Sequence, residues 1–393
     1  MYQTFDAWDA LAAEPTIGVN GDSSSPSLPQ DEASSSQTAT SVGRDIISAA
    51  CLLRASAVLR TKIRSGGGDE VYEWERWLRH VLWLQNQNLA ENDGTQSTWQ
   101  GKDFFAKEIE PASIALYEFR MGQWDEFNFL SAGVKKIDKQ KKNTIISQLS
   151  FLKDVIGAAA SAKEAEILVL ELLLRAQKYS ATNDDAMLSR FLDEFLPLIE
   201  RCALWMALTR PSPMQRHGRV FAILDLMEGN SLVVSKDIPG IDDIEALKVS
   251  MNDYKFGASA GGKRLAAAIL NRLNSHLMIT DCIAMPPDQE TTIDTILPEK
   301  IQKGSEWDES WTEEDHEEWS HCLGNLALMS KIGGKSKRGK KGSDSTSWEG
   351  KTKLYKKESW PLTKQLADLA SWSVDTIKDR QKVVLSVAEL VWK

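Results

Sequence analysis

The sequence is poor in cysteine and has no long apolar run. Its four cysteines are widely spaced and include no C-x-x-C pair: Cys51, Cys202, Cys282 and Cys322. This spacing indicates neither a zinc site nor a disulfide framework, so we expect a reducing intracellular compartment, cytoplasmic or nuclear. The most apolar stretch, residues 167–174, is interrupted by Glu171 and is much shorter than the roughly 20 residues that cross a bilayer. We therefore expect no association with a membrane.

Several common catalytic motifs are also missing. The chain has no G-x-x-x-x-G-K-[ST] phosphate loop, no G-x-G-x-x-G after a strand, no H-E-x-x-H and no G-x-S-x-G. The net charge of −9 and the pI near 5.3 argue against electrostatic attraction of the whole chain to nucleic acid. Any contact with nucleic acid must therefore be local.

The composition changes along the chain in a way that predicts its domains. The 393 residues, 42% apolar and 26% charged, suffice for two or three globular domains with hydrophobic cores. Residues 15–43 are dominated by Ser, Thr, Pro, Gln and Gly, which bury too little apolar area to offset the entropy of ordering. We predict a disordered tail over residues 1–43, a helical domain over residues 44–260 and a further domain over residues 261–393.

Local signals predict where several helices of the helical domain begin and end. Ser161 and Glu164 form an S-x-x-E pattern, which predicts a capping box before the apolar run 167–174. Another helix is expected over residues 184–208, and Pro211-Ser212-Pro213 would end it.

In the further domain, apolar spacing predicts helices over residues 263–277 and 373–392 and a strand over residues 278–285. A shorter strand is expected over residues 292–298, because Pro298 cannot donate to a strand ladder.

Two short segments carry the most specific signal. Asp294 places a carboxylate inside the expected strand 292–298. Downstream, the pair Gly324-Asn325 is suited to a tight loop between His321 and an apolar run.

At these residues the sequence resembles the C-terminal nuclease domain of GmrSD-type restriction endonucleases, an HNH (His-Me finger) module that attacks modified DNA. The first motif of that family is an acidic residue, a His, two apolar residues and a Pro; its second is an apolar residue followed by Gly-Asn-Leu. Asp294, Pro298 and Gly324-Asn325-Leu326 match these motifs. Thr295 stands where the family has its general-base His.

The resemblance continues downstream with a Lys in a short helix, a Tyr, a Leu-Thr pair, and a helix that follows a Trp, contains Ile and Arg and ends in Trp. The matching residues, in order, are Lys351, Tyr355, Leu362, Thr363, Trp372, Ile377, Arg380 and Trp392. We therefore predict a mainly α protein, in which a helical bundle precedes a small α+β HNH-like (ββα-metal) domain.

The resemblance also implies roles for the motif residues. Asp294 would be a metal ligand, for Mg²⁺ or Mn²⁺ if the site is competent and for no cofactor otherwise. A one-metal nuclease needs a base to deprotonate water, and a threonine hydroxyl is a poor base near neutral pH. General-base catalysis is worth about 10²–10⁴-fold, so Thr295 predicts an impaired catalytic centre. Asn325 would brace the motif loop, and His321 or His316 would be the surrogate base in a residually active variant.

Charge is distributed unevenly around these motifs. Residues 306–318 contain eight carboxylates and no Lys or Arg. A basic loop follows, with Lys331, Lys335, Lys337, Arg338, Lys340 and Lys341. We interpret this loop as a solvated segment, a phosphate-contacting or nuclear-import patch, or an intramolecular partner of the acidic stretch. Lys351 and Arg380 are expected to be either structural or phosphate-facing.

The leading hypothesis is a DNA-associated protein of the restriction-endonuclease family with an impaired catalytic centre. The alternatives are a non-enzymatic helical scaffold that binds another protein, and a residually active metal-dependent DNA endonuclease with a surrogate base. Restriction proteins of this kind also carry an NTP-dependent domain with a D-G-x-Q-R type motif, which this sequence lacks. A protein partner that supplies this domain is therefore a further expectation.

Overall fold

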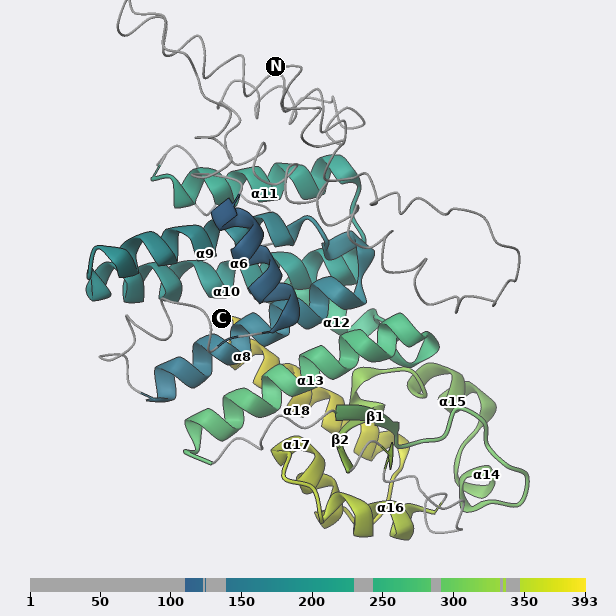
Figure 1. Ribbon diagram of the computed structural model, residues 1–393. Helices are drawn as coiled ribbons and strands as arrows, with labels where there is room; N and C mark the ends of the chain where they lie inside the picture. The colour runs from purple at the N-terminus through teal and green to yellow at the C-terminus, as the bar shows by residue number, and fades with distance from the viewer. Residues whose placement is uncertain are drawn as a thin grey trace, which may run out of the picture. The chain divides into compact units, whose positions relative to one another are not determined.

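The computed structural model describes residues 110–122, 124, 139–229, 243–283, 291–332, 335–336 and 347–393 (Figure 1). The chain divides into two compact units, Met1–Tyr117 and Glu118–Lys393, and helix α6 (Glu110–Met121) crosses the division between them. The predicted tail over residues 1–43 lies outside the described residues.

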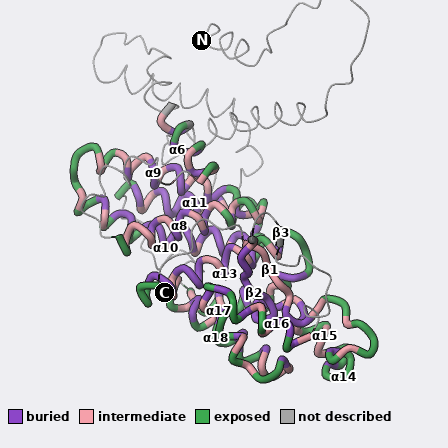
Figure 2. The backbone as a smooth tube through the Cα atoms, turned by 60° about the horizontal axis from the view of Figure 1, so that its bottom comes forward, coloured by how far each residue is buried: buried purple, intermediate pink, exposed green. Residues whose placement is uncertain are grey.

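The first half of the second unit is built from four long helices: α8 (Lys139–Ala158), α9 (Ala165–Ala181), α10 (Asp185–Thr209) and α11 (Pro213–Met227). Helices α8 and α9 both pack along α10, and α11 packs against α9 and α10. Buried residues recur at three- and four-residue intervals in α10, including Leu192, Leu196 and Ile199. This spacing gives each helix an apolar face that the neighbouring helices cover (Figure 2).

The predicted helix over residues 184–208 is confirmed, since α10 spans Asp185–Thr209 and ends before Pro211. The Asp184 carboxylate accepts a hydrogen bond from the Met187 backbone N–H at 3.0 Å and so caps α10. After α10 ends, Ser212 and Gln215 form a reciprocal capping box that starts α11.

The capping box predicted from Ser161 and Glu164 is wrong. Ser161 lies in the short 3-10 turn η5 (Ala160–Ala162), and Glu164 stands at the N-cap of α9 without a side-chain cap hydrogen bond. The Glu164 carboxylate instead accepts a hydrogen bond from Arg216 Nε at 2.8 Å. Glu164 therefore pairs with Arg216 of α11 instead of contributing to the cap of α9 that the local sequence pattern predicted.

The second half begins with α12 (Ile244–Asp253), η7 (Phe256–Ala258), α13 (Ala260–Thr280) and β1 (Thr291–Thr295). It continues with α14 (Glu306–Ser310), α15 (Glu313–Trp319), η8 (Leu323–Asn325), β2 (Leu326–Ile332) and β3 (Lys335–Ser336). The last elements are α16 (Trp348–Tyr355), α17 (Pro361–Lys364), η10 (Gln365–Asp368) and α18 (Val374–Trp392). The expected last helix is thus confirmed, and Ser373 caps it by accepting from the Thr376 backbone N–H.

Strands β1 and β2 form an antiparallel pair, whose register runs from Thr291 opposite Ser330 to Thr295 opposite Leu326. The two-residue strand β3 pairs with β2 on its other side. The strand expected over residues 292–298 is therefore present but ends at Thr295. The next two residues, Ile296 and Leu297, turn into the hydrophobic core, where both are fully buried.

The strand predicted over residues 278–285 is wrong at its start, because α13 continues to Thr280. Met278 and Ile279 extend the buried face of this helix. Burial against neighbouring helices therefore overrides the strand preference of β-branched residues. The rest of that predicted strand includes residues 284–285, which lie outside the described residues.

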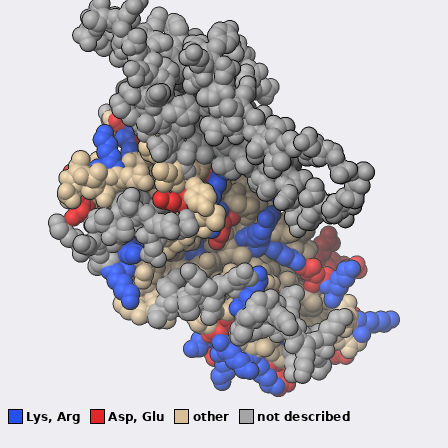
Figure 3. Space-filling model, in the orientation of Figure 1, with Lys and Arg blue, Asp and Glu red and all other residues tan. Residues whose placement is uncertain are grey.

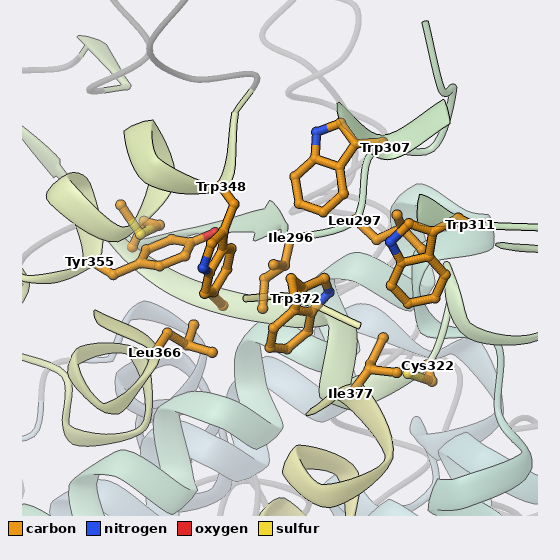
Figure 4. Packing of buried hydrophobic residues seen from close by; sticks show 12 residues of the cluster. Ile296, Leu297, Trp307, Trp311, Cys322, Trp348, Tyr355, Leu366, Trp372 and Ile377 are labelled. Carbon is orange, nitrogen blue, oxygen red and sulfur yellow. The ribbon is translucent and has the colours of Figure 1, made fainter. Parts of the chain in front are cut away.

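A tryptophan-rich core lies beside the strand pair (Figure 4). Ile296 and Leu297 pack in it with aromatic residues from α14, α16 and the segment before α18. The rings of Trp348 and Trp372 are stacked, with centroids 5.4 Å apart. The core thus anchors the chain directly after β1, and with it the position of Asp294.

Helix α13 joins the two halves, because it packs against α8 as well as against β1 and α18. Arg272 of α13 and Glu200 of α10 form a buried ion pair, with Nε 2.7 Å from Oε1. The predicted boundary between residues 260 and 261 falls at the start of this helix. That boundary stays a prediction.

The described part of the chain is mainly helical, as predicted, with one small antiparallel sheet among the described residues. Within the same residues, every helix is either too short or too polar to cross a membrane.

Candidate functional site

Asp294 lies next to the last residue of β1, opposite Ala327 of β2. Its Oδ2 atom accepts hydrogen bonds from Lys351 Nζ at 2.8 Å and from the Tyr355 hydroxyl at 2.6 Å. The Asp294 side chain keeps 18% of its exposure. The carboxylate is thus held by two donors from one helix while part of it remains open to solvent.

Lys351 and Tyr355 lie on the same face of α16 because they are four residues apart. Ser347 starts this helix by accepting a hydrogen bond from the Gly350 backbone N–H at 3.1 Å. Lys351 Nζ also donates to the Thr295 carbonyl oxygen at 2.8 Å. These acceptors compensate for the burial of the ammonium group, since Lys351 is only 6% exposed.

Asn325 fixes the turn that follows β1. Its Oδ1 accepts from the Leu297 backbone N–H at 2.7 Å, and its Nδ2 donates to the Leu297 carbonyl at 3.1 Å. The same Nδ2 donates to the Ser320 carbonyl at 2.8 Å, and the Asn325 backbone carbonyl accepts from Ile296 N at 2.9 Å. Because Asn325 is fully buried, losing these bonds would leave several backbone groups unsatisfied.

Gly324, directly before Asn325, allows close approach of α18. A β-carbon at Gly324 would lie 3.0 Å from the backbone nitrogen and 3.1 Å from the Cα of Gln381. The Gly324 backbone N–H donates to Gln381 Oε1 at 2.5 Å. The glycine of the Gly-Asn-Leu segment is therefore required by packing against α18.

Arg380 of α18 is buried and supports the backbone of the site. Its Nη1 donates to the Leu362 carbonyl at 2.7 Å, and its Nη2 donates to the Leu326 carbonyl at 3.0 Å. Burial lowers the pKa of its guanidinium to about 10. The sequence left Arg380 and Lys351 with a structural or a phosphate-contacting role; these internal hydrogen bonds favour the structural role, and the phosphate contact stays a prediction.

The two histidines near the motif have contacts elsewhere. His316 Nε2 lies 2.8 Å from the Pro298 carbonyl oxygen, and the His321 ring packs against Gly257. Burial lowers the pKa of the His321 imidazole. Among the described hydrogen bonds, neither imidazole reaches Asp294. The charged groups that influence His321 are Glu299, Lys255, His316 and Lys263.

The comparison with protein families identifies this part of the chain. Residues 242–387 match the family described as GmrSD restriction endonucleases, C-terminal domain. This segment is a GmrSD-type C-terminal domain. The searches of curated proteins and of solved structures gave no significant match.

The match begins at residue 242, so the GmrSD-type domain includes α12 in addition to the segment from residue 261 onward that the sequence predicted. It contains the predicted site residues Asp294, Thr295, His321, Asn325, Lys351 and Arg380.

The structure describes only the start of the basic loop, with Lys331 in β2. Lys335 belongs to β3, and its side chain is not described. The other predicted phosphate contacts of the loop, Lys337, Arg338, Lys340 and Lys341, lie outside the described residues.

The residues around Asp294 do not fit a Mg²⁺ or Mn²⁺ site. Such ions take several oxygen ligands, often including more than one carboxylate. Within the described ranges, no group of three His, Cys, Asp or Glu side chains is arranged to hold a metal ion. The Lys351 ammonium stands 2.8 Å from Asp294 Oδ2, where it would repel a second cation. The role of Asp294 as a metal ligand therefore stays a prediction that this set of ligands does not favour.

Sequence reasoning did not assign Tyr355 to the site of the GmrSD-type domain. The available signal was its spacing of four residues from Lys351, which puts both side chains on one helix face. That spacing does not reveal that the face meets Asp294, which lies 61 residues earlier in the chain.

Proposed function

We propose that the GmrSD-type domain is an HNH-like domain that associates with DNA and has an impaired catalytic centre. The order of its elements supports the HNH-like fold, because the antiparallel strands β1 and β2 are followed by α16. Lys351 and Tyr355 attach α16 to the end of β1. These elements give a ββα unit in which the acidic residue of the first motif faces the helix.

The contacts of Asp294 are the observation on which the impairment rests. Its carboxylate oxygen binds Lys351 and Tyr355, and the next residue along the strand is Thr295. A threonine hydroxyl cannot accept a proton from water efficiently near pH 7, and loss of a general base lowers rates about 10²–10⁴-fold.

A surrogate base finds little support in the geometry. His316 Nε2 faces a carbonyl oxygen, which can only accept, so this nitrogen must carry the proton. Burial lowers the pKa of the His321 imidazole, but the ring packs beside Gly257 and does not reach Asp294 in any described hydrogen bond. Hydrolysis through either ring would require the motif loop to rearrange.

Plasmid cleavage tests the proposal. The purified full chain is incubated with supercoiled plasmid, unmodified or cytosine-modified, in the presence of Mg²⁺ or Mn²⁺. We expect no nicked or linear product from the unaltered chain, and Thr295→His tests whether the missing base alone explains the loss of cleavage. Cleavage by the unaltered chain that disappears in Asp294→Asn would contradict the impairment and establish a metal-dependent endonuclease.

A gel-shift measurement with the same DNA tests association independently of cleavage. Binding without cleavage supports the proposal. Absence of both would favour a protein-binding scaffold, for which the exposed carboxylates of α14 and α15 provide an acidic surface.

A further inference from the structure

We infer that three exposed lysines on the α16–α17 segment, Lys356, Lys357 and Lys364, form the surface that contacts the phosphate backbone of DNA. This inference rests on the proposed function and assigns a place to the DNA contact. We call these three residues the α16–α17 basic patch.

Helix α16 has two chemically distinct sides. Lys351 and Tyr355 are buried and point to Asp294, whereas Lys353, Lys356 and Lys357 are exposed. Lys356 and Lys357 lie three and four residues after Lys353, so the exposed side of α16 continues into them. Lys356 is the C-cap residue and Lys357 follows it, so both extend from the end of the helix.

The acidic residues of this segment do not neutralise the patch. Glu349 is paired with Lys353 at 2.8 Å. Glu358 is buried and accepts from the Ser330 hydroxyl at 2.9 Å. In the described part of the chain, the patch lysines Lys356, Lys357 and Lys364 form no ion pair. Their ammonium groups are therefore available to an external anion.

Lys and Arg side chains gather over α16 and α17 in the space-filling view (Figure 3). In contrast, residues 306–318 on α14 and α15 carry eight carboxylates and no Lys or Arg. A polyanion approaching the GmrSD-type domain would therefore be attracted to α16 and α17 and repelled by α14 and α15. This uneven charge lets a protein with a net charge of −9 bind DNA locally.

Buried aromatic residues hold the backbone that carries the α16–α17 basic patch. Tyr355 is fully buried, and Trp348 is buried against Trp372. Trp360, directly before α17, donates from Nε1 to the Ser330 hydroxyl at 3.0 Å. The lysines therefore project from backbone that is fixed on both sides, next to the residues that hold Asp294.

Binding of a short fluorescein-labelled DNA duplex, followed by fluorescence anisotropy over a range of salt concentrations, tests the inference. The test variant is the full chain with Lys356→Gln, Lys357→Gln and Lys364→Gln. The control carries Lys178→Gln, Lys300→Gln and Lys303→Gln, which remove the same charge from other exposed positions. Thermal unfolding of each variant verifies that it is folded.

We expect the patch variant to bind at least about tenfold more weakly at physiological salt, and the slope of log K against log[salt] to fall by about 3, because each lysine–phosphate contact contributes about 0.9. The control variant should bind as the unaltered chain does. Equal binding by the patch variant and the control would overturn the inference while leaving DNA association intact. Failure of the unaltered chain to bind any duplex would overturn the proposed DNA association as well. If the unaltered chain bound anionic phospholipid vesicles and no duplex, the patch would be assigned to a membrane surface instead.

Discussion

Two ion pairs of the second unit, Arg272–Glu200 and Lys351–Asp294, have the same chemistry but different surroundings. Arg272 and Glu200 are 4% and 0% exposed, and Gln148 approaches the same carboxylate at 3.4 Å. Asp294 keeps 18% of its exposure. The first pair is enclosed between helices, whereas the second lies at the end of a strand and is partly open.

This difference separates a structural pair from a candidate site. An enclosed pair cannot meet a ligand, so its contribution is confined to stability and to fixing the helices that carry it. A partly open carboxylate whose charge is balanced by the chain can meet solvent or a ligand. Burial therefore indicates which of two similar pairs belongs to a functional surface.

The largest effect is expected from Arg272→Met, which leaves the Glu200 carboxylate buried without its cation. The free energy of unfolding should fall by about 3–5 kcal/mol, measured by urea denaturation. The double variant Glu200→Gln, Arg272→Met removes both charges and should recover much of this loss. A double variant as unstable as the single one would show that packing, and not charge, explains the effect.

Lys351→Met should have a smaller effect, about 2 kcal/mol, because water and the Tyr355 hydroxyl still reach Asp294. Urea denaturation measures this change too, with the exposed Lys353→Met as the matched control. Tyr355→Phe, which removes only one neutral donor, should cost about 1 kcal/mol. If Lys351→Met lost as much stability as Arg272→Met, the Lys351–Asp294 pair would be as enclosed as the Arg272–Glu200 pair.

A weaker test uses one histidine from each half, the buried His217 and the half-buried His321. Burial lowers the pKa of His217 in α11 and of His321 near the candidate site. The unfolded chain therefore takes up protons at higher pH than the folded chain does, and the free energy of unfolding falls as the pH drops below about 6.5. His217→Gln should flatten this decline more than His321→Gln does, because His217 is the more deeply buried. Urea denaturation at several pH values between about 7 and 5.5 measures the pH dependence of the free energy of unfolding for both variants.

The smallest effect is expected from divalent metal. If Lys351 supplies the positive charge beside Asp294, the midpoint of thermal unfolding should be the same with Mg²⁺ and with EDTA, since a ligand that does not bind cannot stabilise. A rise with Mg²⁺ that is lost in Asp294→Asn would assign the carboxylate to a metal site and remove the main contrast with a competent nuclease.

The most accurate predictions from the sequence concern features that depend on residues close together in the chain. The helices expected over residues 184–208 and 373–392 are both present, and each begins at a cap formed within one helical turn, by Asp184 and by Ser373. The pair Gly324-Asn325 was predicted to make a tight loop, and both residues lie in the short 3-10 turn η8.

The predictions were wrong or incomplete where a residue contacts another that is far away in the sequence. Glu164 was assigned to a cap but binds Arg216, which lies 52 residues away. The helical state of residues 278–280 depends on neighbouring helices that no local pattern reveals. Likewise, the sequence left Lys351 with two alternative roles, because its contact with Asp294 spans 57 residues.

The contact between α10 and α18 has a consequence for how the protein is made. Arg201 of α10 donates to the carbonyl of Trp392 at 3.0 Å, across 191 residues of sequence. The Trp392 ring also packs against Phe151 of α8, with centroids 5.3 Å apart. During synthesis, α8 and α10 leave the ribosome long before α18 is made. The part of their apolar surface that α18 covers therefore stays exposed until then. Until α18 emerges, this exposed apolar surface can associate with other chains.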